Sequence, residues 1–300
     1  MEEGALVLEG GAFRGVFTSG VLDAMIDDNF YLSYVIGVSA GALTGTGYVA
    51  RQRGFSKSVN LEYRNDKNYV GLKAIYKEKS IIGFDYLFNE ISVNKVPFDF
   101  EAFYESNIRF IATTSCIETG KAEYFEKDKC PEILRAVRAS SSIPVITPNV
   151  KIGDKHYHDG GICDPVPFLK AMDDGYKKIV VVLTRPLTYE GHTKRIIIDA
   201  LKKIYHKNKE FYKAIINMDK KYNDERIMLK ELVDSGKVFV IAPKTDVYIS
   251  NLEKDVSKLE AFYQDGYNAY YEAKDALIKY FAQDAQEIWF SYWNKNVIVI

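Results

Sequence analysis

The chain has 300 residues, of which 47% are hydrophobic and 27% are charged, and its net charge is −1. This composition is typical of one large or two ordinary globular domains and excludes a disordered or fibrous protein. A net charge so close to zero gives no reason to expect nucleic acid as a partner. The three cysteines, Cys116, Cys130 and Cys163, have neither metal-ligand nor disulfide-framework spacing, so we expect a reducing compartment and no metal or other cofactor.

The N-terminal residues favour a cytoplasmic location. Two glutamates precede a short apolar run, which does not resemble a secretory signal. No apolar run approaches the roughly 18 residues that a bilayer-spanning helix needs. These features leave peripheral contact with a membrane surface open.

Two strand–turn–helix units begin the chain. Residues 5–9 form a short apolar run that predicts a buried strand, and residues 15–28 have apolar residues at helical spacing. The pattern repeats with a predicted strand at 34–38 and a predicted helix at 40–52. Such alternation favours an α/β fold with a largely parallel central sheet.

The middle of the chain predicts further parts of the same sheet. Residues 53–107 show no clear periodicity, apart from "VPFDFEAFYES", which leads into a helix. The elements expected after it are a strand at 108–116, a helix between Pro131 and Pro144, a hairpin turning at Gly153 and Asp154, a helix at 165–176 and a strand at 178–186.

The last third of the chain predicts helices and one late strand at 237–243. Between Lys194 and Lys230 there are eleven basic and five acidic residues on an amphipathic stretch. Its apolar face either packs on the sheet or lies on anionic headgroups, and we favour packing. The residues of that face are Ile197, Leu201, Ile204, Phe211 and Ile215. Helices are expected over 251–293, and the tryptophan-bearing segment 287–300 either anchors at an interface or docks on the domain.

A first glycine-bearing motif, "LEGGAFRG" at 8–15, lies where a predicted strand meets a predicted helix. Glycine amides and a helix N-terminus can hold a phosphate or an oxyanion at such a turn. The glycine spacing matches neither a dinucleotide-binding fingerprint nor a P-loop. Arg14 within the turn is either an anion-binding residue or an ordinary surface arginine.

Two further motifs follow. Ser39 lies between Gly37 and Gly41 in a G-x-S-x-G sequence with a predicted strand before it and a helix after it, the setting of a nucleophile elbow. We therefore expect Ser39 to act as a nucleophile. In "YHDGGICDPVP", Asp159 precedes Gly160 and Gly161, a pattern that an ordinary Asp-Gly turn also produces.

Together, and in this order, the three motifs resemble the patatin-like phospholipase family. The resemblance covers about residues 5–185 and includes "RASSSIP" before Asp159 and "DPVP" after it. Ala12 stands where the family's G-G-G-x-R-G turn has a third glycine. The resemblance implies a three-layer α/β sandwich with a catalytic domain at 1–190, and a mostly helical extension at 191–300 packed on the same domain.

The same resemblance implies a serine hydrolase that cleaves acyl esters of lipids, with Ser39 as nucleophile and Asp159 as base. An ordinary aspartate, with a pKa of about 3.9, is a weak base at neutral pH, so Asp159 would have to be buried. The oxyanion would be held by backbone amides, and the glycines of the motifs would shape the turns. The amide candidates are Gly10, Gly11, Ala12 and Ala40, beside Arg14, and the motif glycines are Gly15, Gly37, Gly41, Gly160 and Gly161.

Three alternatives stay open. A Ser–His–Asp esterase needs a histidine after the aspartate, for which His192 is the candidate, whereas His206 lies among lysines and His156 and His158 precede Asp159. We expect His158 to be structural. An acyltransferase would share the acyl-enzyme, and a non-catalytic lipid- or anion-binding protein could use the same scaffold.

Overall fold

The computed structural model describes residues 1–283. The segment 287–300, for which we weighed an interfacial anchor, lies outside the described residues. No helix of residues 1–283 combines the length and the apolar character that crossing a bilayer requires.

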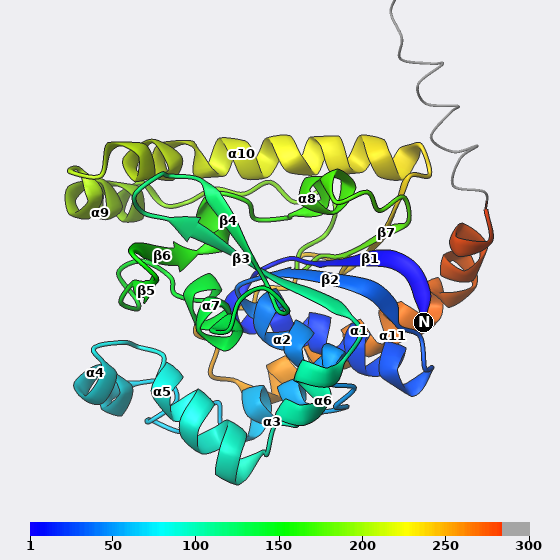
Figure 1. The fold of residues 1–300 in the computed structure, drawn as a ribbon, viewed down its shortest axis with the longest axis horizontal. Coiled ribbons are helices and arrows are strands. Elements are labelled where there is room, and N and C mark those ends of the chain that lie inside the picture. Colours follow the sequence, from blue (N-terminus) through cyan, green and yellow to red (C-terminus); the bar gives the residue numbers. More distant parts are fainter. Residues whose placement is uncertain (284–300) are drawn as a thin grey trace, which may run out of the picture.

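A mixed sheet runs through the centre of the molecule (Figure 1). Its strands are β1 Glu2–Leu8, β2 Leu32–Val38, β3 Arg109–Cys116, β4 Ala122–Glu126, β5 Val150–Ile152, β6 Lys155–Asp159, β7 Ile179–Val182 and β8 Val238–Ile241. In the described chain their order is β5-β6-β3-β2-β1-β7-β8, with β4 paired to β3. The pairs from β3 through β2, β1 and β7 to β8 are parallel, whereas β4, β5 and β6 pair antiparallel. The predicted largely parallel sheet is confirmed.

Helices cover both faces of this sheet. They are α1 Gly15–Asp27, α2 Ala40–Val49, α3 Phe55–Glu62, α4 Leu72–Glu78, α5 Phe84–Tyr86, α6 Phe100–Glu105, α7 Ile133–Ser140, α8 Phe168–Asp173, α9 Arg195–Tyr205, α10 Lys209–Asp234 and α11 Val256–Ala282, with a π-helix at Leu87–Lys95. Figure 1 shows α8 and α10 above the sheet and α1, α2 and α11 below it. This arrangement confirms the three-layer prediction and the helical C-terminal extension.

Alternation along β1 explains why the layers form. Successive strand residues point to opposite faces. Leu6 and Leu8 join the core beneath the sheet with residues of α1, α2 and α11. Ala5 and Val7 join the core above it with residues of α8 and α10. A strand that is apolar on both faces must be covered on both faces, and residues 209–282 supply a helix for each side.

The long helix α11 replaces the several helices expected over 251–293, and it packs on α1 at backbone contact. A Cβ on Gly266 would lie 2.0 Å from the Phe17 carbonyl oxygen, and one on Gly20 would lie 2.0 Å from that of Tyr263. Because each helix has a glycine where it meets the backbone of the other, the two helices approach more closely than side chains would allow.

The amphipathic stretch 194–233 differs from the prediction. It forms two helices, α9 and α10, separated at residues 206–208. Ile197 and Ile204 are exposed, so the expectation that they share one packed face with Leu201 was wrong. The physical reason is that Leu201 and Tyr205 occupy the packing positions of α9, in a small core around Phe211.

Candidate active site

Ser39 occupies a sharp turn between β2 and α2, with φ 55° and ψ −122°. L-residues other than Asn and Asp seldom adopt such positive φ values, and this strain is a known feature of the nucleophile elbow. The flanking glycines make the turn possible: a Cβ on Gly41 would lie 2.3 Å from the Leu8 carbonyl oxygen, and one on Gly37 would lie 2.6 Å from the backbone of Gly41. The structure therefore has the strand–turn–helix geometry that the motif predicts.

Asp159 ends β6, and the structure brings it to Ser39. Both side chains line the same cleft, and Asp159 Oδ1 accepts the Gly161 N–H at 2.8 Å. Burial raises the pKa of Asp159 to about 6, although the neighbouring Ser39 hydroxyl and the Gly161 N–H act in the opposite direction. The carboxylate is thus ionised at neutral pH and is a stronger base than an exposed aspartate.

A run of three buried serines at the end of α7 holds the two residues in place. The Ser39 N–H donates to Ser140 Oγ at 2.9 Å, and Ser141 Oγ donates to the Ser39 carbonyl at 3.0 Å. The Ser142 carbonyl accepts the Asp159 N–H at 2.9 Å. The sequence analysis noted "RASSSIP" only as part of a resemblance and gave these serines no role. Their signal was the placement of three consecutive hydroxyls at a predicted helix end.

The glycine-rich turn after β1 lies directly against Ser39. A Cβ on Gly10 would lie 3.1 Å from the Ser39 Cβ. Ala12 has a φ of 49°, which the missing third glycine would have adopted without strain. Within residues 1–283 no hydrogen-bond acceptor is bound by the amides of Gly10, Gly11 or Ala12, and the Ala40 amide is in the first turn of α2, where a helix leaves N–H groups unpaired. These four amides therefore meet one requirement of the oxyanion hole that the sequence predicts, which is to have no acceptor of their own within residues 1–283.

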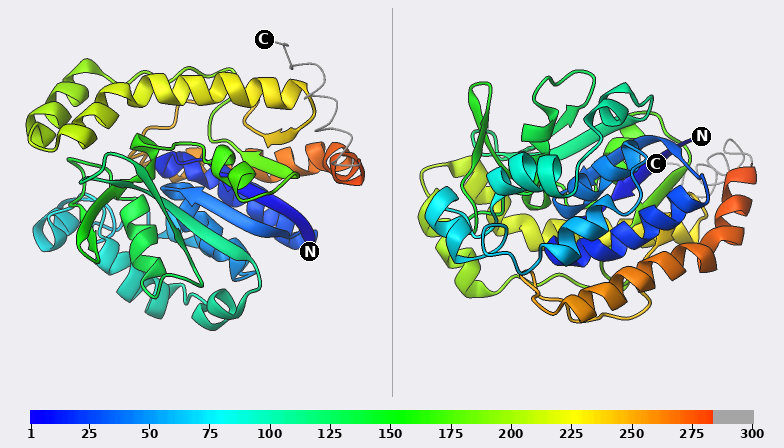
Figure 2. Two further views of the ribbon diagram at one scale, coloured as in Figure 1. Left: turned by 45° about the horizontal axis from the view of Figure 1, so that its top comes forward. Right: turned by 90° about the horizontal axis from the view of Figure 1, so that it is seen from below.

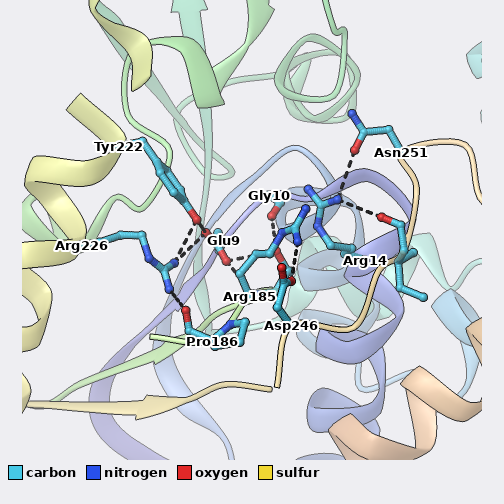
Figure 3. Close-up of polar contacts among 11 residues, drawn as sticks. Glu9, Gly10, Arg14, Arg185, Pro186, Tyr222, Arg226, Asp246 and Asn251 are labelled. Carbon is cyan, nitrogen blue, oxygen red and sulfur yellow. Dashed lines mark hydrogen bonds and ion pairs between the residues drawn. The ribbon is translucent and has the colours of Figure 1, made fainter. Parts of the chain in front are cut away.

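Behind this turn, the buried carboxylate of Glu9 fixes its position (Figure 3). Glu9 Oε2 accepts the Thr184 N–H at 2.6 Å, and Oε1 accepts Tyr222 Oη–H at 2.8 Å and Arg226 Nη1–H at 3.2 Å. The Thr184 hydroxyl lies 2.7 Å from the Gly10 carbonyl and 3.0 Å from Glu9, and its single proton can serve one of them at a time. The sequence analysis missed Glu9; the signal was an acidic residue ending an otherwise apolar strand.

Arg14 is held by a loop and is neither free nor ion-paired. Its Nη1 donates to the Ile249 carbonyl at 3.2 Å and to Asn251 Oδ1 at 3.3 Å (Figure 3). Burial, together with the neighbouring cation Arg185, lowers the pKa of Arg14. No carboxylate of residues 1–283 forms an ion pair with it, whereas Arg185 is paired to Asp246. The Arg14 charge thus lies on the wall of the cleft that holds Ser39 and Asp159.

Two hollows meet at Ser39, and the second has more polar and charged residues in its lining than the first. One is an apolar pocket, and more than half of its large apolar lining comes from residues 53–107, where the sequence predicted little. Its large apolar residues are Phe13, Leu43, Phe55, Val59, Tyr69, Ile82, Phe84, Leu87, Phe88, Phe98, Phe100, Leu134 and Ile143. The other is a polar cleft that contains Asp159, Arg14, Arg185, His192 and Lys194.

All four histidines of the chain lie in the described part, and none of them hydrogen-bonds to Ser39 or Asp159. His158 is buried between the Ser142 carbonyl and the Tyr205 hydroxyl, and burial lowers its pKa to about 4. His192 is exposed at the rim of the polar cleft, 3.9 Å from Glu190. His156 contacts Glu118, and His206 contacts the carbonyl of its own helix turn.

A metal site is not formed by the residues that are described. Among residues 1–283, no three His, Cys, Asp or Glu side chains are grouped closely enough to hold an ion.

Comparisons with known proteins bear on both parts of the chain. A family model described as patatin-like phospholipase matches residues 6–172, and a model described as a domain of unknown function (DUF6363) matches residues 208–282. The uncharacterized protein YjjU of Escherichia coli is 30% identical over 187 residues, which are 61% of this chain and 52% of YjjU. The chain thus matches about half the length of that relative.

Two further proteins are similar to the chain. A probable lipid hydrolase, 463L, of Invertebrate iridescent virus 6 is 26% identical over 210 residues, which are 62% of this chain and 71% of the viral protein. Among solved structures, VipD from Legionella pneumophila aligns with a TM-score of 0.49 and 13% identity, over 92% of this chain and 67% of that one.

Proposed function

Since the chain belongs to the patatin-like phospholipase family, we propose that it is a serine hydrolase that cleaves acyl esters of lipids. The observation that carries this proposal is the placement of Ser39 beside Asp159, between an apolar pocket and backbone amides that bind no acceptor within residues 1–283. A relative described as a probable lipid hydrolase supports the same chemistry.

The proposed reaction uses Asp159 as the base. Ser39 Oγ attacks the ester carbonyl carbon while its proton passes to Asp159, and the carbonyl oxygen becomes an oxyanion. The amides of Gly10, Gly11, Ala12 and Ala40 donate hydrogen bonds to that oxygen; a donor of this kind contributes about 10²–10³ in rate. The alcohol then leaves with the proton from Asp159, and an acyl-enzyme remains.

Water completes the cycle through the same groups. It attacks the acyl carbonyl as Asp159 removes its proton, and the collapse of the second tetrahedral intermediate returns the proton to Ser39 and releases the carboxylic acid. A pKa of about 6 suits this double role, because Asp159 is ionised at neutral pH yet gains a proton more readily than an exposed aspartate.

The two hollows assign the ends of the substrate. The apolar pocket would take the acyl chain, because most of its lining consists of aromatic and aliphatic side chains. The polar cleft would take the alcohol side of the ester, next to Arg14 and Arg185. An amphiphilic ester with its carbonyl at Ser39 fits this division.

We also propose that residues 191–300 are a working part of the domain at 1–190. Tyr222 and Arg226 of α10 hold Glu9, next to the glycine-rich turn. Glu225 of the same helix accepts the Val166 N–H at 3.3 Å, just beyond the Asp159 loop. The C-terminal region thus supports two of the three motifs.

The decisive experiment is covalent labelling by a fluorophosphonate, detected by intact mass. We expect wild type and His192→Ala to be labelled, and Ser39→Ala and Asp159→Asn to lose labelling. Asp154→Asn, which changes an exposed aspartate of the same hairpin, is the matched control. Loss of labelling in His192→Ala would replace the dyad by a triad, and a folded wild type that stays unlabelled would favour a lipid-binding protein without catalysis.

A further inference from the structure

Helix α9 presents a second apolar face that nothing in the described chain covers. Leu201 and Tyr205 pack inward, whereas Ile196 is 76% exposed and Ile197 and Ile204 are also exposed. With 3.6 residues per turn, these three isoleucines and Ala200 lie within an arc of about 100° on the helix surface. Clustered exposed aliphatic side chains of this kind mark an interaction surface.

The charge around this face identifies the kind of partner. From residue 194 to 209 the basic residues are Lys194, Arg195, Lys202, Lys203, Lys207 and Lys209, and the one acidic residue is Asp199. Asp199 lies 3.5 Å from Arg195 and 3.9 Å from Lys202. The other four lysines form no ion pair with any carboxylate of residues 1–283, so their charges are available to an anionic surface.

Helix α4, on the other side of the hairpin β5–β6, also has exposed apolar residues next to lysines. Leu72, Ile75 and Tyr76 are exposed at i, i+3 and i+4 spacing, and Tyr76 is 90% exposed. Lys73 and Lys77 lie between and beside them. Figures 1 and 2 place α4 and α9 at the same end of the molecule.

Helix α9 lines the entrance to Ser39, and α4 is connected to the same entrance through the loop at 143–146. Lys194 and Ile197 line the polar cleft, and so do Ile143 and Pro144 on its other wall. Val145, next to Pro144, is 62% exposed and has a φ of 72°, a costly conformation for a β-branched residue. The loop is joined to the segment after α4, because the Ile146 carbonyl accepts the Ile81 N–H at 3.0 Å.

We propose that α9, α4 and Val145 together form a docking surface for an anionic lipid bilayer. The isoleucines and Tyr76 enter the boundary between headgroups and acyl chains, the lysines contact the anionic headgroups, and the cleft opens onto the membrane that supplies the ester. The role that we give this surface rests on the proposed function, but its binding to membranes can be tested without hydrolysis of any ester.

The test is co-sedimentation of the full chain with vesicles of phosphatidylcholine, alone or mixed with phosphatidylglycerol. Ser39→Ala is the background, so that no hydrolysis alters the lipid. We expect binding to the mixed vesicles that weakens as salt is raised, and binding about tenfold weaker for Ile196→Ser/Ile204→Ser and for Leu72→Ser/Tyr76→Ser, because each removes two inserted side chains. Ile227→Ser is the matched control, since Ile227 is 63% exposed on α10, roughly 27 Å along the helix from the α9 end.

Three results would overturn this surface: both double variants bind like the parent, the parent binds neither vesicle, or light scattering finds a dimer that Ile196→Ser/Ile204→Ser converts to a monomer. The same substitutions with Ser39 intact should keep the wild-type rate of fluorophosphonate labelling, which shows that the fold is preserved. A labelled wild type without vesicle binding refutes the docking surface alone, whereas vesicle binding without labelling refutes the proposed hydrolase alone.

Discussion

Glu9 and Asp159 are buried carboxylates that line the same cleft as Ser39, and their surroundings differ. Glu9 is 3% exposed and is bound by Thr184, Tyr222 and Arg226. Asp159 is 6% exposed, accepts the Gly161 N–H and lies beside the Ser39 hydroxyl, with no cation paired to it among residues 1–283. One carboxylate has its charge balanced, and the other does not.

This difference corresponds to two roles: a carboxylate paired with a cation stabilises the structure, whereas an unpaired buried carboxylate can act as a base. A carboxylate that is paired with a cation, such as Glu9, fixes the loop that it anchors. A buried carboxylate without a cation has a raised pKa and exchanges a proton readily, at the expense of stability. We make four predictions from this difference, from the largest expected effect to the smallest.

Removing the exchangeable proton site should have the largest effect. Asp159→Asn keeps the shape of the side chain but cannot accept the Ser39 proton, so we expect ester turnover to fall about 10²–10⁴-fold, the usual contribution of a general base. Initial rates on a soluble ester measure it, with Asp154→Asn as control. Turnover within about threefold of wild type would remove Asp159 from the mechanism.

Removing the cation that is paired with Glu9 should mainly lower the free energy of unfolding. Arg226→Met leaves a buried carboxylate without its cation, and breaking a buried pair in this way costs about 3–5 kcal/mol. Urea unfolding measures the loss, and Arg226→Met combined with Glu9→Gln should recover part of it. A single variant as stable as wild type would show that Glu9 does not depend on Arg226.

The same comparison predicts that Asp159→Asn stabilises the protein. The folded pKa of about 6 lies above the ordinary value of 3.8, so folding favours the protonated form and stability is lost as pH rises through 6. Asparagine carries no such charge. The gain should be at most about 3 kcal/mol at pH 8 and should vanish below about pH 4. Urea unfolding at the two pH values measures it, and a variant less stable than wild type at pH 8 would contradict the contrast.

The pH dependence of turnover should show the smallest effect. As pH falls through about 6, Asp159 gains a proton, and kcat/KM should fall to about a tenth at pH 5. The profile is measured on a soluble ester across a range in which unfolding is excluded by circular dichroism. A midpoint near 4 would mean that Asp159 behaves like an exposed aspartate.

How far the sequence could predict this site depends on how local each signal is. The Ser39 elbow and the Asp159 turn are short motifs, so their positions could be predicted before the structure. Glu9 could not be assigned, because its partners Tyr222 and Arg226 are more than 200 residues away and no local pattern links them. The family resemblance, rather than periodicity, supplied the pairing of Ser39 with Asp159.

Periodicity also failed where more than one face of a helix is apolar. In α9, spacing alone grouped Ile197 and Ile204 with Leu201, but packing uses Leu201 and leaves the isoleucines in solvent. In 53–107 the helices are short and include a π-helix, so no long stripe forms. Their apolar residues face a pocket, which needs no regular spacing.

The anchoring of Glu9 by α10 has a consequence for protein synthesis. Glu9 and Arg226 are 217 residues apart, so the loop that follows the first strand obtains its anchor only after most of the chain has left the ribosome. Contacts of such long range form late in folding. In a nascent chain, Ser39 would therefore be present long before the loop beside it is anchored. During refolding, we expect the reactivity toward a fluorophosphonate to return later than the helical circular dichroism signal. Under the proposed function, such a delay would leave the serine unable to react with membrane lipids until the C-terminal helices are in place.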